Sequence, residues 1–394
     1  MLSRSRCITA LSLVLLAAMA PRPSSAQQVS VIAAGKNAMA PATADGIVYF
    51  LSDDSRLYAV NAADGSPVSG FPADIAAAVN DGSKPIGRPS IYDAGDGKGI
   101  YVATDNGGVV RFGADGAVKW VYKGASDKLY VPNVYSPALT ADGDVFAVST
   151  YSGAGHVIKL RAADGGFVIA SPGMPNASAL AVVDGYVYSG NNGATVLNTS
   201  DLSIRAGLGS SSTNFGPAYI VGNSLFMASN TGGGYLYKAN RTTLAFDATF
   251  AGAGAASVSA DGVNCIFADT TAKPAPKLYA ATGGLLWPTV YEVDGATGAT
   301  KTLIQTPLLG IPYGIVINRS NNTLAFSCIQ ANISTGEVKY VLYQVSIADP
   351  VNGVRISPNL QGELTLPAFD PITKRFFVGS TGAVNGILYG FDSM

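Results

Sequence analysis

The single histidine of the chain, His156, is the side chain best suited to proton transfer near neutral pH. It follows a short Gly-rich stretch, residues 152–155, and Tyr151 precedes that stretch. We select His156, Tyr151 and, from an earlier loop, Asp54 as candidate catalytic residues. A metal site is not expected, because one histidine cannot form a His-rich site and the acidic segment 93–99 lacks the alternating carboxylates of a calcium loop.

A second set of polar side chains recurs in predicted loops and could bind a ligand. The loops are rich in amide, hydroxyl and tyrosine groups, which suits a neutral polar ligand such as a carbohydrate, or a protein loop, better than phosphate or nucleic acid. Ordinary solvated loop residues would produce the same pattern, so both interpretations stay open. The candidate ligand-binding residues are Asp53, Arg56, Arg88, Asp105, Asn106, Tyr135, Asn192, Asn230 and Tyr313.

These residues must be positioned by a repeated unit of short strands. The segment from Gly46 to Pro67 shows the unit well, with two partly alternating apolar runs, a polar turn between them and then an Asp-Gly pair that favours a tight hairpin turn. A repeat of 20 to 50 or so residues is typical of a propeller or an array. The units begin, 38 to 57 residues apart, at Met39, Gly87, Tyr135, Ala177, Phe215, Ala255, Pro312 and Thr365.

Asp-Gly pairs set the register within each unit. They follow the predicted first strand at 45–46, 96–97, 142–143, 184–185 and 261–262, and the third strand at 64–65, 115–116, 164–165 and 294–295. Two such turns on one side of a four-stranded antiparallel unit describe a propeller blade. The loops between second and third strands and the links between blades then lie on the opposite face, so the candidate residues converge on one axial mouth.

The strand count predicts an all-β, single closed propeller, most simply of eight blades. The unit from Thr365 supplies only three strands, and the unassigned N-terminal strand at 29–33 can supply the fourth. Joining the first and last strands closes the ring and removes an exposed sheet edge. Seven blades stay open as an alternative, because the sixth and seventh units are long and irregular.

Residues 1–26 resemble a signal peptide rather than part of the fold. Arg4 and Arg6 precede a short apolar run at 8–20, and Ser-Ser-Ala at 24–26 is a small-residue cleavage site. We therefore expect cleavage after Ala26, export to the periplasm or beyond, a propeller domain over 27–394 and no transmembrane segment. Net charge is −1, which gives no basic field for nucleic acid. A closed ring needs no partner to hide its edges, so we expect a monomer.

Two cysteines remain after the predicted cleavage, Cys265 and Cys328. An oxidising compartment permits a disulfide between them. Strands in the same layer of neighbouring units lie on the order of 10 Å apart, which is beyond disulfide reach. Two buried free thiols and one bridge therefore both stay open.

Two segments resemble the repeat of the pyrroloquinoline-quinone-type (PQQ-like) β-propellers: LYAVNAADGSPVSGF at 57–71 and VVRFGADGAVKWVY at 109–122. In that family a Gly-x-x-x-aromatic strand follows the Asp-Gly turn, and the aromatic residue docks one blade on the next. Trp120 takes that place here, Phe71 the comparable place in the first blade, and Val168 or Ile169 in the third. The closest member in size is the eight-bladed lipoprotein of the outer-membrane protein assembly machine, which implies a periplasmic protein–protein scaffold.

The resemblance also marks differences. Cys7 precedes the apolar run, whereas a lipid-anchored cysteine would follow it. The quinone-dependent dehydrogenases of the family are much longer and carry adjacent cysteines, so no quinone or other cofactor is expected. Two functions follow: an exported non-enzymatic binding protein or scaffold that holds a protein or glycan at a rim or the axial mouth, or an exported hydrolase, lyase or quinone-type oxidoreductase with its site at that mouth.

Overall fold

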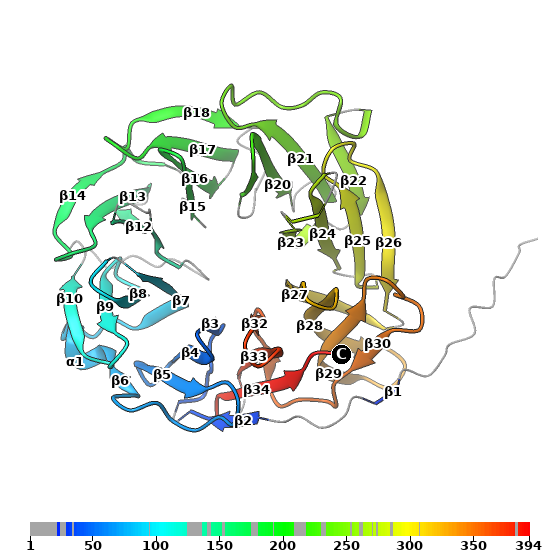
Figure 1. The fold of residues 1–394 in the computed structure, drawn as a ribbon, viewed down its shortest axis with the longest axis horizontal. Coiled ribbons are helices and arrows are strands. Elements are labelled where there is room, and N and C mark those ends of the chain that lie inside the picture. The colour runs from blue at the N-terminus through cyan, green and yellow to red at the C-terminus, as the bar shows by residue number, and fades with distance from the viewer. Residues whose placement is uncertain are drawn as a thin grey trace, which may run out of the picture.

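The computed structural model describes residues 22–23 and 29–394, except 34, 94, 124–135, 140–142, 152–153, 175–179, 192, 209–217, 230–233, 253, 260–262, 270, 273–274, 284–286, 307 and 383–384. Within these residues the strands form eight antiparallel sheets around a central opening, as Figure 1 shows. The chain is therefore an eight-bladed β-propeller, and the predicted fold class is confirmed.

Blades 1 to 7 are each built from four strands that follow one another in the chain from the axis outwards. Blades 1 to 4 consist of β3 (Ala42–Ala44), β4 (Ile47–Ser52), β5 (Arg56–Asn61) and β6 (Ala73–Asp74); β7 (Pro85–Asp93), β8 (Lys98–Thr104), β9 (Val109–Gly113) and β10 (Val118–Tyr122); β11 (Ala138–Leu139), β12 (Asp144–Tyr151), β13 (Ala154–Arg161) and β14 (Phe167–Ala170); and β15 (Leu180–Val183), β16 (Tyr186–Asn191), β17 (Gly193–Asn198) and β18 (Ile204–Leu208).

Blades 5 to 7 follow the same plan with longer strands towards the end of the chain. They consist of β19 (Tyr219–Val221), β20 (Ser224–Ser229), β21 (Gly234–Asn240) and β22 (Ala255–Ser259); β23 (Val263–Asp269), β24 (Lys277–Thr282), β25 (Thr289–Asp294) and β26 (Thr300–Gln305); and β27 (Leu309–Asn318), β28 (Thr323–Asn332), β29 (Glu337–Ser346) and β30 (Val354–Ile356). Strand β1 (Arg22–Pro23), inside the predicted signal peptide, pairs in parallel with β30.

Blade 8 is completed by the strand nearest the N-terminus. It combines β31 (Glu363–Leu364), β32 (Ala368–Asp370), β33 (Arg375–Thr381) and β34 (Ile387–Asp392) with β2 (Val29–Ile32). Strand β2 pairs antiparallel with β34, with Val31 opposite Leu388. Val31 packs against a buried cluster that includes Phe50 and Phe377, which joins blade 8 to blade 1. The predicted closure by the N-terminal strand is confirmed.

Of the predicted Asp-Gly turns, those at 45–46, 64–65, 96–97, 115–116, 164–165, 184–185 and 294–295 lie where the register predicts, and they mark one of the two faces of the ring. Between first and second strands, Asp45 and Gly46 have φ of 51° and 75°, the two positive values that a tight type I′ hairpin needs. We call this end of the ring the turn face. The opposite end carries the blade-to-blade links and the loops between second and third strands, and we call it the link face.

Neighbouring blades pack together where the outer strand of one blade meets the turn between the third and fourth strands of the next. Trp120 of β10 donates from Nε1 to the carbonyl oxygen of Ala162 (2.7 Å). Its indole also covers Gly165, where an added Cβ would lie 2.5 Å from Trp120 Cε3. Phe71 meets Tyr49 edge-on at 5.9 Å, as Trp120 meets Tyr101. Both aromatic residues therefore occupy the positions that the resemblance implies.

In the third blade the packed residue is Ile169, which lies against a buried cluster. Val168 is exposed.

One predicted unit boundary is wrong. The segment AASVSADG, from Ala255, was expected to open the sixth unit, but Ala255–Ser259 is β22, which pairs with β21 as the outer strand of blade 5. The first strand of blade 6 is β23, and Asp261-Gly262 lie outside the described residues. The outer strand β22 consists of small and β-branched residues and is followed by Ala-Asp-Gly. An innermost strand and its turn have the same local sequence pattern, so the pattern alone does not distinguish the two.

The residues 73–79, the nearest helical candidate in the sequence, form one helical turn. Helix α1 (Ile75–Val79) is capped by Asp74, whose carboxylate accepts from the amide of Ala77 (2.8 Å). No helix in the described part of the chain is long and apolar enough to cross a membrane.

Candidate ligand-binding site at the axial mouth

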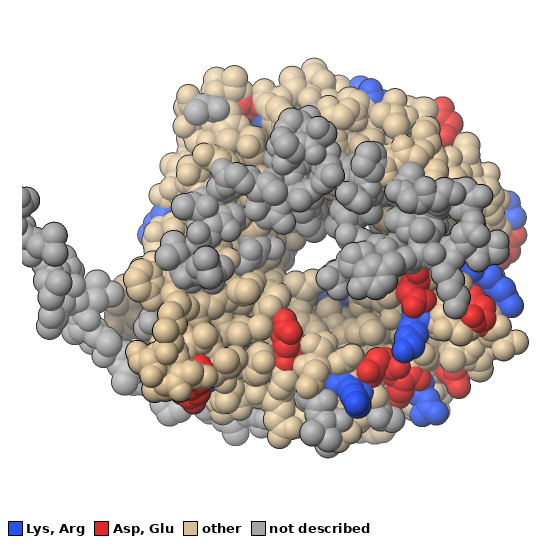
Figure 2. Space-filling model, turned by 180° about the vertical axis from the view of Figure 1, so that it is seen from behind, with Lys and Arg blue, Asp and Glu red and all other residues tan. Residues whose placement is uncertain are grey.

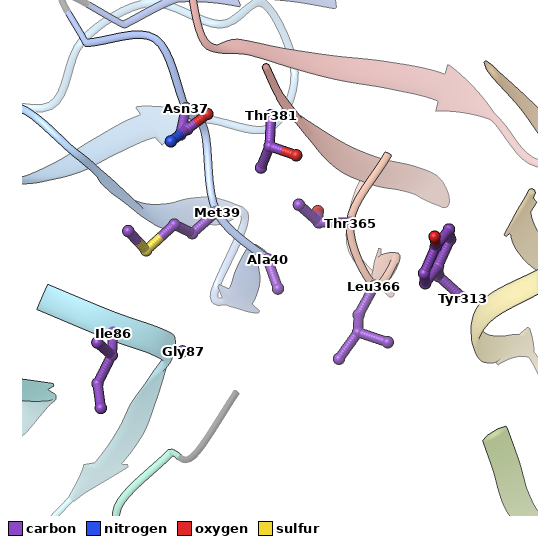
Figure 3. A pocket seen from close by; sticks show the side chains of 9 residues that line it. All are labelled: Asn37, Met39, Ala40, Ile86, Gly87, Tyr313, Thr365, Leu366 and Thr381. Carbon is purple, nitrogen blue, oxygen red and sulfur yellow. The ribbon is translucent and has the colours of Figure 1, made fainter. Parts of the chain in front are cut away.

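A cavity of about 350 Å³ opens on the link face beside the axis. Blades 1, 2, 7 and 8 contribute to it, chiefly through the segments that lead into their innermost strands, as Figure 3 shows. We call it the mouth pocket. Its lining residues are Asn37, Met39, Ala40, Ile86, Gly87, Tyr313, Thr365, Leu366 and Thr381.

The mouth pocket combines apolar side chains with fixed polar groups. In Figure 3, Met39, Ile86 and Leu366 project into the space between the blades, and Asn37 lies beside Thr381. Asn37 is held on both sides, because its amide nitrogen donates to Asp53 (3.2 Å) and its oxygen accepts from the backbone of Gly382 (2.8 Å). The pocket therefore presents a preformed apolar surface with a polar edge.

Tyr313, on β27, supplies a hydroxyl donor at the wall of this pocket. Its hydroxyl donates to Glu363 Oε1 (2.7 Å). Burial raises the pKa of Tyr313 above its ordinary value, and the Glu363 carboxylate raises it further. Tyr313 therefore stays protonated at all physiological pH values and acts as a hydrogen-bond donor, not as a base.

Blade 7 extends the apolar surface outwards from the pocket. Strands β27, β28 and β29 are ten residues long, and their register places Leu309, Ile311, Ile329 and Val338 on the same face of the sheet as Tyr313. Ile311 is 40% exposed and Val338 46%. We call Leu309, Ile311, Ile329 and Val338 the blade 7 overhang.

Charge is distributed unevenly over the link face. Figure 2 shows charged residues gathered over one part of this face and few of them over another. The described charged residues of blades 1 and 2 there include Asp53, Arg56, Asp81, Lys84 and Asp105. The overhang exposes Ile311 and Val338, and the ion pair of Lys339 with Glu337 flanks Val338 on β29.

Three polar residues on innermost strands do not line the mouth pocket. Arg88 lies on β7, Tyr219 on β19 and Cys265 on β23. Tyr219 packs against the core cluster between blades 5 and 6, and Cys265 packs against the cluster between blades 6 and 7. Burial raises the pKa of Tyr219 to about 12 and lowers the pKa of Arg88.

Comparisons with known proteins agree with this architecture. Residues 34–188 match the family model described as "Outer membrane protein assembly factor BamB". This part of the chain is therefore similar to the PQQ-like β-propellers. None of the curated proteins matches the chain in sequence.

Solved structures similar to this propeller cover almost its whole length. BamB from Moraxella catarrhalis matches with 17% identity and a TM-score of 0.60, over 93% of this chain and 99% of that one. The computationally designed Ika8 protein matches with 13% identity and a TM-score of 0.65, over 92% and 99%. The Dos1 propeller matches with 11% identity and a TM-score of 0.63, over 93% and 94%. At these identities the likeness establishes the fold alone.

The ring brings one of the predicted ligand residues into the mouth pocket. Tyr313 lines this pocket, whereas Arg88, on the innermost strand β7, does not. Asp53 binds the backbone of Asn37 (3.0 Å) and so fixes the segment that leads into blade 1. Asp105 accepts from the Lys84 amide (2.9 Å), which likewise fixes a link.

Three further candidates lie in or beside the loops between second and third strands of blades 1 and 2, and none of them lines the mouth pocket. Asn106 accepts from Thr104 and from the Gly108 amide, and it donates to the Lys123 carbonyl (3.2 Å). Arg56 is an exposed residue at the start of β5. Asp54 accepts from the Tyr58 hydroxyl (2.6 Å) and lies in blade 1. Tyr135, Asn192 and Asn230 lie outside the described residues.

His156 is not part of a loop, as the sequence suggested, but of strand β13. The pairing of β12 with β13 continues to Tyr151 and Ala154, so the connection is shorter than expected and His156 lies opposite Ser149. Its Nδ1 is 2.7 Å from the carbonyl oxygen of Ser171. Because His156 belongs to the third strand of blade 3, it does not line the mouth pocket, and Asp54 belongs to another blade.

The apolar lining of the mouth pocket was missed. Met39, Ile86 and Leu366 each lie one to three residues before a proline. Met39 and Leu366 belong to the short segments that lead into an innermost strand, and Ile86 lies at the start of the innermost strand β7. The proline-containing segments were visible in the sequence. An unusually large apolar residue in them was the available signal, because such a side chain has no place in a solvated link.

Both thiols are expected to be nearly inert in the folded protein. Cys265 and Cys328 are free, lie in one buried cluster, and burial raises the pKa of each to about 12. Because the thiolate is the reactive form, we expect modification by Ellman's reagent at pH 8 at least about a hundredfold slower than for free cysteine. In guanidinium, the chain from Gln27 onwards should show two reactive thiols. A rapid native reaction, or fewer than two thiols after unfolding, would contradict this result.

Proposed function

We propose that this PQQ-like propeller is an exported, non-enzymatic binding protein that holds a protein partner on its link face. The observation that carries the proposal is the blade 7 overhang, which exposes Ile311 and Val338 beside the preformed mouth pocket. Exposed apolar side chains next to a concave apolar site are typical of protein-binding surfaces. The predicted signal peptide supports export to the periplasm or beyond.

The mouth pocket favours a protein over a glycan. Met39, Ile86 and Leu366 line it, and such side chains match an apolar anchor residue of a partner. Sugar rings instead require aromatic faces with many hydrogen-bonding groups. Tyr313 is the one aromatic residue among those that line the pocket, and Trp287, 49% exposed in the loop between β24 and β25, does not line it. The matching family, described as an assembly factor, adds support by analogy.

The proposal is tested by charging the overhang. Ile311→Asp places a carboxylate in the middle of the apolar surface, where it would be desolvated by a bound partner, so we expect capture of that partner to fall at least about tenfold. Partners cross-linked to the wild-type protein in its host would be quantified by mass spectrometry against the variant. The binding constant would then be measured by calorimetry with the purified partner.

Ile372→Asp is the matched control. Ile372 is 65% exposed but lies in the turn between β32 and β33, on the opposite, turn face. It should leave capture unchanged. If Ile311→Asp binds every partner as the wild type does, or if both variants lose binding equally, the overhang is not the binding surface. Binding of an oligosaccharide array that depends on Trp287 would assign the face to a glycan.

A further inference from the structure

The apolar face of the blade 7 overhang is directed towards blade 8. Tyr313, Ser327 and Leu342 are paired across β27, β28 and β29, so Leu342 lies on the same face of the sheet as Tyr313 and the overhang. Leu342 belongs to the buried cluster in which blade 7 packs against blade 8, together with Leu364 of β31. The overhang continues this packed face beyond the cluster, out to the link face.

A carboxylate from blade 8 lies at the inner end of this face. Glu363 of β31 is paired with Thr381, which lines the mouth pocket. Its Oε1 accepts from the hydroxyl of Tyr313 (2.7 Å), the residue at the blade 7 side of the pocket in Figure 3. Strand β31 also contacts β28 and β29, which carry Ile329 and Val338 of the overhang. The exposed Glu363 carboxylate therefore lies where the overhang meets the pocket.

Glu363 differs from the other two glutamates of the chain in its partners. Within the residues that the structure describes, Glu363 forms no ion pair, whereas Glu292 pairs with Lys277 (2.7 Å) and Glu337 with Lys339 (3.2 Å). An ionised carboxylate can accept about four hydrogen bonds, so the Tyr313 hydroxyl leaves room for further donors. A cation from another molecule can therefore bind Glu363 without displacing a cation of this chain.

A partner that covers the overhang would also remove water from this carboxylate. Ile311 and Val338 are exposed beside Glu363, and a wholly apolar surface that covers them would leave Glu363 desolvated without a counter-charge. Burying an unpaired carboxylate is strongly unfavourable, so such a partner would bind poorly. A partner that brings a guanidinium or ammonium group to Glu363 avoids this penalty and gains charge-assisted hydrogen bonds.

On the basis of the proposed function, we propose that the partner segment on the blade 7 overhang carries a basic side chain that pairs with Glu363. An apolar residue beside it in the same segment enters the mouth pocket. Glu363 then determines which apolar segments are accepted, whereas Ile311 and Val338 contribute contact area to all of them.

Synthetic decapeptides test this pairing. Two series share a central pair of leucines, which is followed by arginine in one series and by its neutral isostere citrulline in the other. In low-salt buffer, the wild type should bind the arginine series at least about tenfold more tightly, as expected for a charge-assisted hydrogen bond. Glu363→Gln should bind both series equally. Glu337→Gln is the matched control and should keep the preference for arginine, because Glu337 is a link-face glutamate that already pairs with Lys339.

Glu363→Gln keeps an oxygen that can accept from the Tyr313 hydroxyl, so its Tm should equal that of the wild type. A Tm several degrees lower would assign Glu363 to the packing of blades 7 and 8. A wild type without a preference for arginine, a Glu363→Gln variant that keeps the preference, or a Glu337→Gln variant that loses it equally would show that Glu363 selects no cation. Each of these results overturns the proposal.

The same variants separate this pairing from the proposed function. If Ile311→Asp loses the captured partner while Glu363→Gln retains it with unchanged salt dependence, the overhang binds protein and only the pairing with Glu363 fails. If Glu363→Gln alone loses the preference for arginine and Ile311→Asp captures every partner as the wild type does, the overhang is not the binding surface, although Glu363 binds cations.

Discussion

Trp120→Ala is expected to destabilise the propeller by about 3–5 kcal/mol, the range for truncating a buried aromatic residue. Trp120 is 7% exposed and joins blade 2 to blade 3 in two ways. It donates to Ala162 and covers Gly165, both of blade 3, and within its own blade it meets Tyr101 edge-on. The substitution removes all three contacts and leaves the Ala162 carbonyl without this donor. Urea unfolding, followed by circular dichroism, measures the loss.

The second tryptophan provides the control. Trp287 is 49% exposed, so Trp287→Ala should change stability by less than about 1 kcal/mol. Trp120→Phe keeps much of the ring packing but not the hydrogen bond, and an intermediate loss is expected. If Trp120→Ala unfolds at the same urea concentration as Trp287→Ala, the docking of blades through this residue is not a source of stability.

Val31→Asp is expected to open the ring and to cost about 2–4 kcal/mol, since it desolvates a carboxylate without a partner. Val31 lies on β2 opposite Leu388 and packs against the cluster that joins blades 8 and 1. Ser30→Asp introduces the same charge one residue earlier, where the side chain is exposed. Because neighbouring residues of a strand point to opposite sides, Ser30→Asp should be nearly neutral.

Thermal unfolding of both variants, with the protein concentration varied, would measure this difference. An opened ring presents unpaired strand edges, so Val31→Asp should also show concentration-dependent association. Equal melting temperatures for the two variants, with no association in either, would mean that β2 contributes nothing to closure.

The fold was predictable because its signals are local and repeated. The turns at Asp45-Gly46 and Asp184-Gly185 are predictable because both pairs consist of residue types that tolerate positive φ. The role of strand 29–33 follows from the number of strands that the last blade lacks. The boundary at Ala255 failed because outer and inner strands share a composition, and only pairing with β21 distinguishes them.

The site was less predictable, because it depends on distances across the ring. Tyr313 and Arg88 are both polar residues of the predicted links, but only Tyr313 lines the mouth pocket, and nothing local to the two residues distinguishes them. His156 was placed in a loop because its glycines suggested one, whereas the register of β12 and β13 continues through that region. The mouth pocket is formed by segments of four blades, which no single repeat reveals.

The pairing of β2 with β34 means that the ring closes only when both ends of the chain are present. Every other described blade can form from consecutive strands. Blade 8 also needs a strand from the far end of the chain, so ring closure is the most non-local step of folding. A chain that has lost either segment keeps seven blades and two open edges. Such a fragment is a template for pairing with other chains, so proteolysis at either end would convert a closed ring into material prone to aggregate.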